Sequence, residues 1–406
     1  MSYLSFLKAN GRWLLAAYLL TLFSGFGQTF FISLFAGNFR EEFGLSHGDV
    51  GSIYMFATLC SALVLPWLGK TVDDYPTQLV AGGVMIGLAL ACLGMALVPG
   101  VWTLCVVIFA LRLFGQGMMT HTSLTAISKW FSAQRGRAMS IAILGYPSGE
   151  AVGPIAFVAL SLAFGWRTSW VVAAAMMALF ALPLVLFLLS RERIPSDDDN
   201  RARVAEGRQW TRAEVMRDPV FWIVCAGILA PPCFGTAIMF HQAYLIELNG
   251  WTQELFASSF IALAVFAVAS SLTAGVLVDR FTARKLIAFT LLPLAVGCIS
   301  LATFSAPWVA FVYMALLGIG NGFATTLVGA LWPEIYGTRH VGAIRSVAFA
   351  LMVFASAAGP GLMGWLIDAG VPYRQQVTGM SIYCLLMVLG LWHASRIMRK
   401  RADSGV

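Results

Sequence analysis

The sequence consists largely of apolar stretches of about 20 residues, separated by short clusters of charged residues. A helix of that length crosses the roughly 30 Å hydrocarbon core of a lipid bilayer. Charged residues make up 11% of the chain and hydrophobic residues 59%, whereas a soluble domain carries about 25% charged residues. A soluble enzyme with an apolar core does not account for this arrangement. The stretches lack the apolar/polar alternation of a membrane barrel, so we predict transmembrane helices, which satisfy their own backbone hydrogen bonds in lipid.

Twelve such stretches are predicted, six in each half of the chain. The first half gives 12–37, 48–68, 78–98, 101–127, 137–164 and 168–190, and the second half gives 219–246, 255–278, 285–304, 307–331, 341–367 and 374–395. The predicted fold class is therefore an all-α membrane protein with twelve transmembrane helices in two pseudo-symmetric six-helix bundles.

The positions of the basic residues predict the orientation. Most of the 26 Lys and Arg residues fall in loops on one side, if the N-terminus is placed inside the cell. Arg40, Arg167 and Arg374 fall on the other side, and Arg112 lies within a span. Positively charged loops stay in the cytoplasm, so we predict that both termini are cytoplasmic and that the membrane is the bacterial inner membrane. The net charge of +7 then reflects topology, and no nucleic-acid partner is expected.

The longest polar stretch separates the two halves. It gives four predicted parts: an N-terminal bundle at 1–190, a cytoplasmic linker at 191–218, a C-terminal bundle at 219–396 and a cytoplasmic tail at 397–406. Within the linker, 210–217 is predicted to be a short amphipathic piece. Several motifs recur in both halves at a nearly constant offset, which indicates a parallel internal repeat of the kind that transporters use to rock one half against the other. The matching sites are Gly69 and Gly275, Asp73 and Asp279, and Gly153-Pro154 and Gly359-Pro360.

Three motifs carry a family resemblance. The loop after the eighth stretch contains Gly275, Asp279 and Arg280, followed by Arg284, and the first half keeps Gly69 and Asp73 but has Asp74 and Pro76 where a basic residue and a glycine are usual. The fourth stretch contains Arg112-Leu-Phe-Gly-Gln-Gly, and the fifth contains Gly149-x-x-x-Gly153-Pro154. Together with the repeat, these motifs resemble the major facilitator superfamily over essentially the whole chain.

The resemblance implies specific roles. In that family the loop residues latch the cytoplasmic side, which implies a cytoplasmic gate made of Gly69, Asp73, Gly275, Asp279, Arg280 and Arg284. The glycines allow close helix approach, and Gly149, Gly153, Pro154, Gly359 and Pro360 are expected to bend and pack their helices. A monomer is expected to suffice. Within the superfamily the sequence looks closest to the monocarboxylate and oxalate–formate branches, although the eighth stretch lacks their usual basic residue.

Two charged residues fall well inside predicted spans, Glu150 and Arg112. Charges at that depth cost about 2.5–3.5 kcal/mol on insertion and are usually functional. At 1.5 Å per residue, Arg112 lies roughly 16 Å and Glu150 roughly 21 Å from the outer ends of consecutive helices, so an ion pair is feasible. We interpret Glu150 as the site that binds and releases a coupling proton, with Arg112 as its partner or as a substrate anchor. The alternative is a static structural pair or a neutral hydrogen-bonded acid.

Other intramembrane polar residues are candidates for lining a central cavity. They are Gln28, Thr29, His121, Tyr146, His241, Gln242 and Asn321. Pro231-Pro232 is expected to break or kink the seventh helix, which we interpret as a gate. The two histidines lie on different helices at different depths, so no metal site is predicted, and the seven cysteines lack metal-ligand spacing.

The predicted function is secondary active transport of a small organic solute, with a monocarboxylate-like anion favoured and H⁺ as the coupling ion. Efflux of an amphipathic drug by proton antiport is an alternative that the aromatic and methionine content suits. A non-transporting membrane sensor is the alternative of another class, and an added soluble domain would be its sign. We find no nucleotide-binding loop, metal-ligand set or nucleophile constellation, so no enzyme activity and no cofactor are predicted. The expected partners are the small-molecule substrate, the coupling ion and the lipid bilayer.

Overall fold

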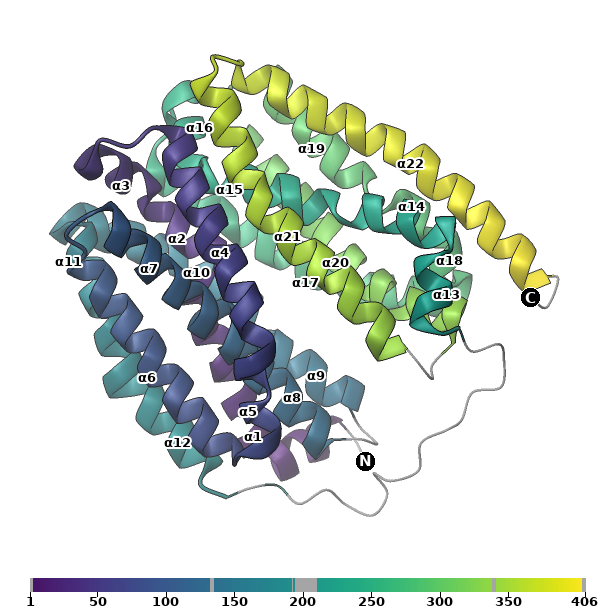
Figure 1. The fold of residues 1–406 in the computed structure, drawn as a ribbon, viewed down its shortest axis with the longest axis horizontal. Coiled ribbons are helices and arrows are strands. Elements are labelled where there is room, and N and C mark those ends of the chain that lie inside the picture. Colours follow the sequence, from purple (N-terminus) through teal and green to yellow (C-terminus); the bar gives the residue numbers. More distant parts are fainter. Residues whose placement is uncertain (1–2, 132–134, 192, 194–209, 338–340, 404–406) are drawn as a thin grey trace. The chain divides into compact units, whose positions relative to one another are not determined.

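The computed structural model describes residues 3–131, 135–191, 193, 210–337 and 341–403. These residues form helices joined by short turns and include no strands (Figure 1). Eleven helices are long and apolar enough to span a membrane. A bent pair, Phe6–Gly27 and Thr29–Phe43, meets at 42° and brings the total to as many as twelve. The predicted fold class is confirmed, with the first span broken rather than continuous.

The chain divides into two compact units. Unit 1 comprises Met1–Leu45 and Ile53–Arg203, and unit 2 comprises Ser46–Ser52 and Val204–Val406. Most of the predicted linker, 192 and 194–209, lies outside the described residues. Its last part contains a short helix, α13 (Arg212–Met216), within the predicted amphipathic piece.

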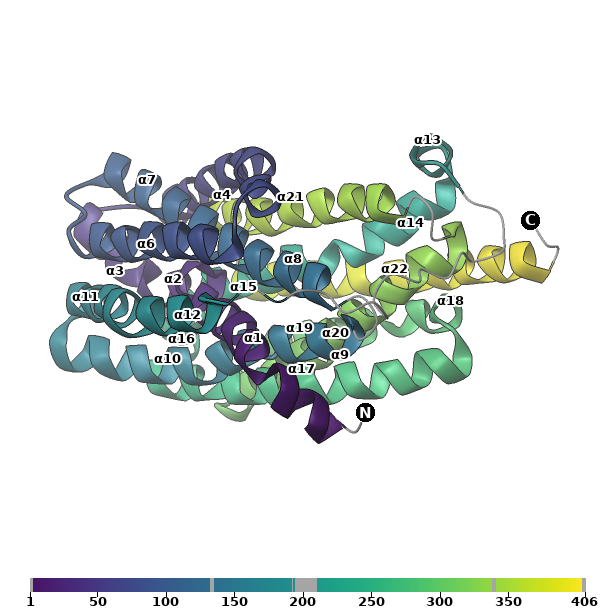
Figure 2. The same cartoon turned by 90° about the horizontal axis from the view of Figure 1, so that it is seen from below.

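The helices of unit 1 begin with a broken span and end at the linker, and residues 47–52 at the start of α4 belong to unit 2. They are α1 (Tyr3–Phe23), η1 (Ser24–Gly27), α2 (Thr29–Ile32), η2 (Ser33–Phe35), α3 (Ala36–Phe43), α4 (His47–Gly69), α5 (Thr71–Asp74), α6 (Thr77–Ala96), α7 (Val101–Leu111), η3 (Arg112–Met119), α8 (Thr120–Trp130), α9 (Arg135–Ile143), α10 (Gly145–Phe164), α11 (Trp166–Ala175), η4 (Met176–Ala181) and α12 (Leu182–Leu189). Within this unit α6 lies beside α11 and α12, and α1 packs against α8, α9 and α10 (Figures 1 and 2).

Unit 2 contains several of the longest helices of the chain. Its elements are α13, α14 (Pro219–Ile228), η6 (Pro231–Gly235), α15 (Thr236–Phe240), α16 (Gln242–Asn249), α17 (Gln253–Phe281), α18 (Ala283–Leu286), η7 (Ile287–Phe289), α19 (Leu292–Thr303), α20 (Trp308–Tyr336), α21 (Val341–Asp368) and α22 (Tyr373–Asp403). Helix α17 packs along α20, and α19 packs against α20 and α22. Helix α22 continues to Asp403, into the segment predicted to be a tail.

The expected break at Pro231-Pro232 is present in a mild form. The two prolines begin η6, a π-helical turn between α14 and α15, so the helix changes pitch there instead of ending. A proline cannot donate the usual backbone hydrogen bond, and a wider turn absorbs the missing donor. The chain bends again at His241, which separates α15 from α16.

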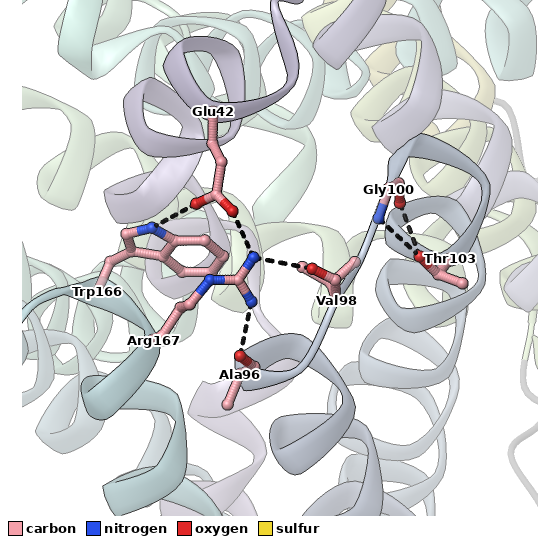
Figure 3. A network of polar contacts seen from close by, with 7 residues as sticks. All are labelled: Glu42, Ala96, Val98, Gly100, Thr103, Trp166 and Arg167. Atoms are coloured by element: carbon pink, nitrogen blue, oxygen red, sulfur yellow. Dashed lines mark hydrogen bonds and ion pairs between the residues drawn. The ribbon is translucent and has the colours of Figure 1, made fainter.

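A polar network fastens one end of unit 1 (Figure 3). Arg167, at the start of α11, donates from Nη1 to the Ala96 carbonyl at 2.7 Å and from Nη2 to the Val98 carbonyl at 2.8 Å. Arg167 also forms an ion pair with Glu42 of α3 at 2.5 Å, and Trp166 Nε1 donates to the same carboxylate at 3.1 Å. The network therefore ties α3, α11 and the loop between α6 and α7 together.

In unit 2, Asp218 is the polar residue that joins the start of α14 to α22 and α20. The residue is 4% exposed, and its carboxylate accepts a capping hydrogen bond from the Val220 amide of α14 at 3.0 Å. The same carboxylate accepts two hydrogen bonds from the Arg401 guanidinium at 2.6 and 3.0 Å. The Tyr336 hydroxyl donates to it at 2.9 Å. Burial disfavours the carboxylate, but the hydrogen bonds from Arg401, the Val220 amide and Tyr336 outweigh burial and lower the pKa of Asp218.

Because the pKa of Asp218 is lowered on folding, its contribution to stability is present above the unfolded value of about 4 and is lost as the pH falls through the folded value. We expect Asp218→Asn to lower the free energy of unfolding by about 2 kcal/mol at pH 7, since charge-assisted hydrogen bonds are lost while asparagine still caps the helix. Thermal unfolding of the purified protein at pH 7 and below pH 4 measures this effect. The difference from wild type should shrink in acid. An undiminished difference would contradict the assignment, and Asp74→Asn, at an exposed site, is the control.

Candidate functional site

The candidate site begins with the break in the first span. Gln28 has an extended backbone (φ −84°, ψ 156°) between η1 and α2. In a continuous helix the Phe31 amide would donate to the Gly27 carbonyl, but here it donates to the Gln28 carbonyl at 3.2 Å. The Gly27 carbonyl is therefore free for another donor. Irregular backbone at membrane depth is tolerated only where other protein groups or water satisfy it.

Arg112 supplies that donor. Its Nη1 donates to the Gly27 carbonyl at 3.2 Å and to Thr29 Oγ1 at 3.3 Å. The guanidinium carbon lies 5.2 Å from the centre of the Tyr54 ring, and the Tyr54 hydroxyl lies 2.5 Å from Thr29 Oγ1. The Arg112 residue is 1% exposed. The residues at the break in the first span therefore bind Nη1 of a fully buried guanidinium.

Two features of the local sequence bring η1 and η3 together at this point. Arg112 begins η3, a π-helical turn, and such turns are frequent at functional sites. Gly27 and Gly115 lie so close that a Cβ on Gly27 would stand 2.7 Å from the Gly115 Cα and would also collide with the Leu111 carbonyl. Glycine is required here because only hydrogen fits between the two backbones.

Glu150 lies on α10 and is 5% exposed. Tyr146, one helical turn earlier, donates a side-chain hydrogen bond to the Glu150 carboxylate. The Tyr146 residue is 36% exposed, and the centre of its ring lies 6.1 Å from the centre of the Phe30 ring. Gly149 lies against the Leu22 carbonyl of α1, which holds this part of α10 close to the first span.

The structure does not bring Glu150 and Arg112 into an ion pair. Neither residue takes part in any of the ion pairs found among the described residues. Arg112 Nε and Nη2 are buried and have no hydrogen-bond partner in that part of the chain. The sequence predicts similar depths for the two residues on consecutive helices. In the structure, however, the Arg112 side chain binds the Gly27 carbonyl that the broken first span leaves free. Tyr146 is the partner of Glu150 instead.

The remaining cavity candidates lie in different places. Gln28 and Thr29 form the break beside Arg112, whereas Asn321 is half-buried on α20. Gln242 is 3% exposed at the start of α16. His241 Nε2 donates to the Pro360 carbonyl at 2.8 Å and so joins α15 to α21.

Among the residues of the proposed gate, the two halves differ. A Cβ on Gly69 would stand 3.2 Å from His121 Nε2, so that glycine does allow close packing and places His121 beside the gate motif. A Cβ on Gly275 would meet nothing within 4 Å, and the expected close approach is absent there in the described part of the chain. The side chains of Asp73 and Asp279 lie outside the described residues. Arg280 is exposed, with its guanidinium carbon 5.5 Å from the Phe281 ring centre.

Glycines of the helix-bend motif lie against other helices. A Cβ on Gly359 of α21 would collide with the Cys233 carbonyl of η6, and one on Gly153 of α10 would stand 3.8 Å from Phe30. Pro154 and Pro360 lie inside α10 and α21. Among the described residues, no group of three or more His, Cys, Asp or Glu side chains is placed to hold a metal ion.

Thr282 has a strained backbone in the turn from α17 to α18. Its φ of +69° with ψ of 150° is a combination that glycine adopts and a β-branched residue does not. The turn is held by Glu334, which accepts from the Ala283 amide at 2.9 Å and pairs with Arg284 at 3.1 Å. Thr282 occupies the place in the second half that corresponds to Pro76, where the family signature has a glycine.

We expect Thr282→Gly to stabilise the protein by about 1 kcal/mol. Relief of the strain is worth about 1–3 kcal/mol, and the greater freedom of glycine in the unfolded chain offsets about 0.5–1 kcal/mol of that. Thermal unfolding of the purified variant tests the sign. Thr325→Gly, at an exposed helical site on α20, should lower stability instead. A Thr282→Gly variant that is less stable than wild type would contradict the strain.

The fold and the buried charges define a multi-pass membrane protein with polar groups assembled inside an apolar bundle. The family model of the Major Facilitator Superfamily matches residues 17–360 and 234–403. The chain therefore belongs to the major facilitator superfamily and is a transporter of that family.

Curated relatives are similar over most of the chain. It is 24% identical over 380 residues to a multi-drug resistance efflux pump PmrA homolog of Lactococcus lactis, covering 89% of this chain and 90% of that one. It is 20% identical to the hexuronate transporter of Escherichia coli strain K12, with 88% and 87% covered. It is 23% identical to the multidrug resistance protein MdtG of Salmonella typhi, with 85% and 83% covered.

A solved structure shares the fold. The inward-facing, unoccupied crystal structure of a bacterial homolog to the human lysosomal transporter Spinster matches with a TM-score of 0.75. The two are 17% identical, and 98% of each chain is covered. At that identity the likeness concerns the fold alone.

Tyr54 is the site residue that the sequence analysis missed. It lies in an apolar stretch of α4 whose hydropathy gives no sign of a polar role. The one signal in the sequence is the tyrosine hydroxyl itself, because a tyrosine buried in a membrane span requires a hydrogen-bond partner. The structure shows that Tyr54 is 0% exposed.

Proposed function

We propose that the protein is a proton-coupled secondary transporter that moves a small organic anion by alternating access. The observation that carries this proposal is the buried Arg112 guanidinium, whose Nε and Nη2 nitrogens have no hydrogen-bond partner among the described residues. A buried cation in a membrane is costly unless an anion compensates it. A carboxylate on the solute supplies that anion, as it does for the monocarboxylate-like substrates that the motifs suggest.

Glu150 is proposed to carry the coupling proton. With Arg112 positive and Glu150 ionised, the empty site has no net charge. Loading one carboxylate together with one proton on Glu150 also leaves no net charge, whereas loading either one alone leaves a net charge inside the membrane. Because such a charge is costly, the fully loaded and the empty forms are the ones that change conformation, and this couples the solute to the proton.

The loops and the bent helices have supporting roles in this transport cycle. The loop residues Gly69, Asp73, Gly275, Asp279, Arg280 and Arg284 form a cytoplasmic gate, and Gly149, Gly153, Pro154, Gly359 and Pro360 let the helices pack and bend. Both termini lie in the cytoplasm, the membrane is the bacterial inner membrane, and a monomer is sufficient.

A second candidate function is efflux of an amphipathic cationic drug by proton antiport. Two of the relatives are named as a multidrug efflux pump and a multidrug resistance protein. The buried Glu150 carboxylate lies one helical turn from Tyr146, whose ring contacts that of Phe30, and a carboxylate with aromatic rings is suited to an organic cation. In this case Arg112 is a structural residue that fastens the broken first span.

Transport in proteoliposomes distinguishes the two functions. Purified protein is reconstituted with a trapped pH-sensitive dye, and small carboxylates, hexuronates and cationic drugs are added outside in turn. We expect carboxylates to drive protons into the vesicles. Proton movement triggered by the drugs alone would establish the efflux function, and no proton movement with any solute would contradict proton coupling.

A further inference from the structure

Helix α22 is longer than the hydrocarbon core of a bilayer. Its 31 residues span about 46 Å at 1.5 Å per residue, whereas the core is about 30 Å thick. The sequence has no Asp, Glu, Lys or Arg between Arg374 and Arg396, and these two arginines are roughly 33 Å apart along the helix. They therefore lie at opposite boundaries of the core, and the turns after Arg396 extend beyond it.

The exposed face of α22 carries a tryptophan followed by two arginines at this second boundary. Trp392 is 44% exposed, and the Arg396 guanidinium carbon lies 3.5 Å from the centre of its ring. Arg399 follows about one turn later and is half-buried, and its Nε donates to the Ser395 carbonyl of the same helix at 3.4 Å. Tryptophan is enriched at membrane interfaces. Stacking on its ring uses the face of the planar guanidinium and leaves the N–H edge for an anion.

Helix α18 brings a third cation to the same end of α22. Both α18 and η7 contact α22, and both views show α18 beside its last turns (Figures 1 and 2). Lys285 of α18 is exposed. Two neighbouring elements of unit 2 therefore present basic side chains at the level of the lipid headgroups.

Two acidic side chains at this end of unit 2 already have basic partners. Glu334 pairs with Arg284 at 3.1 Å, and Asp218 pairs with Arg401 at 2.6 Å. Neither Arg396 nor Arg399 takes part in the ion pairs found among the described residues. Basic clusters that follow a transmembrane helix attract anionic lipids, so a lipid is the anion best placed to balance these two arginines.

We propose that Arg396 and Arg399 of α22, with Lys285 of α18 beside them, bind the phosphate of an anionic phospholipid. Arginine suits this group because its fork of N–H donors can bind two phosphate oxygens. The acyl chains of the lipid run along the apolar part of the same face, where Leu385 and Leu389 are 42% and 63% exposed. The site does not depend on which solute is transported.

Lipid binding to the purified protein tests the inference. Protein in detergent is titrated with phosphatidylglycerol or with phosphatidylcholine of the same acyl chains, and native mass spectrometry counts the lipids that remain bound. Wild type should bind phosphatidylglycerol more tightly than phosphatidylcholine. In Arg396→Gln/Arg399→Gln the affinity for phosphatidylglycerol should fall about tenfold or more, because two cations near the phosphate are lost. Arg396→Lys/Arg399→Lys keeps both charges and should keep most of the preference.

The matched control is Arg212→Gln/Arg374→Gln, at two exposed arginines away from the last turns of α22. It makes the same change in net charge and should bind phosphatidylglycerol as wild type does. An equal fall in affinity in both glutamine variants would show general attraction to the chain and overturn the site. Equal binding of the two lipids by wild type, or unchanged affinity in Arg396→Gln/Arg399→Gln, would overturn it too. Displacement of the bound lipid by excess glycerol phosphate would assign the site to a soluble phosphate and exclude the lipid as its occupant.

Discussion

Vesicles containing Glu150→Gln are expected to exchange solute across the membrane but not to accumulate it when a pH gradient is imposed. Glutamine keeps the size of the side chain and can still interact with Tyr146, but it cannot bind and release a proton. With one proton per solute, wild type should accumulate about tenfold for each unit of pH, because one unit corresponds to about 1.4 kcal/mol. The variant should show no accumulation.

The exchange assay makes this result specific to coupling. If radiolabelled solute inside the vesicles exchanges with unlabelled solute at close to the wild-type rate, then the variant is folded and changes conformation. Glu254→Gln, at an exposed position in the first turn of α17, should both exchange and accumulate. Accumulation by Glu150→Gln at the wild-type level would exclude Glu150 as the proton site.

The second large effect is expected for Gly27→Ala. The added methyl group would stand 2.7 Å from the Gly115 Cα and 2.9 Å from the Gln116 amide nitrogen. These are backbone atoms of η3, which cannot move aside as a flexible side chain does. Overpacking costs about 1–3 kcal/mol, and we expect the upper end here. The methyl group should also push η1 away from η3 and lengthen the hydrogen bond from Arg112 to the Gly27 carbonyl. We therefore expect both the stability of the protein and its affinity for carboxylates to fall.

Gly11 provides the matched control for this substitution. It lies in α1, which continues through η1 to Gly27, and a Cβ there would meet nothing within 4 Å. Alanine favours a helix over glycine by about 1 kcal/mol, so Gly11→Ala should be neutral or slightly stabilising. The unfolding temperatures of the two variants in detergent compare their stabilities directly. A Gly27→Ala variant as stable as Gly11→Ala would show that the two backbones are not in close contact.

The spans were predictable because lipid imposes a simple requirement. A segment that crosses the membrane as a helix must be apolar over a fixed length. Such segments can be recognised from the hydropathy of the sequence. The break at Gln28 was not predictable in the same way. The stretch 12–37 is predominantly apolar and reads as one continuous span, and only the backbone angles show that Gln28 is extended.

The partners of the two buried charges illustrate what sequence reasoning could and could not reach. Tyr146 lies four residues before Glu150, a spacing that places side chains together on a helix, so this pair could have been predicted. The partner of Arg112 could not, because counting residues gives depth but not direction. Each residue turns an α-helix by about 100°, and the π-helical turn at Arg112 changes that phase.

The measurement that tests the central claim most directly is the proton count on solute binding. Purified protein in weakly buffered detergent solution is mixed with a solute that drives transport, and a pH-sensitive dye reports protons taken up or released. For an anion carried with a proton, wild type should take up about one proton per site through Glu150, and Glu150→Gln should take up none. Equal proton uptake by the two proteins would contradict the assignment of the coupling site.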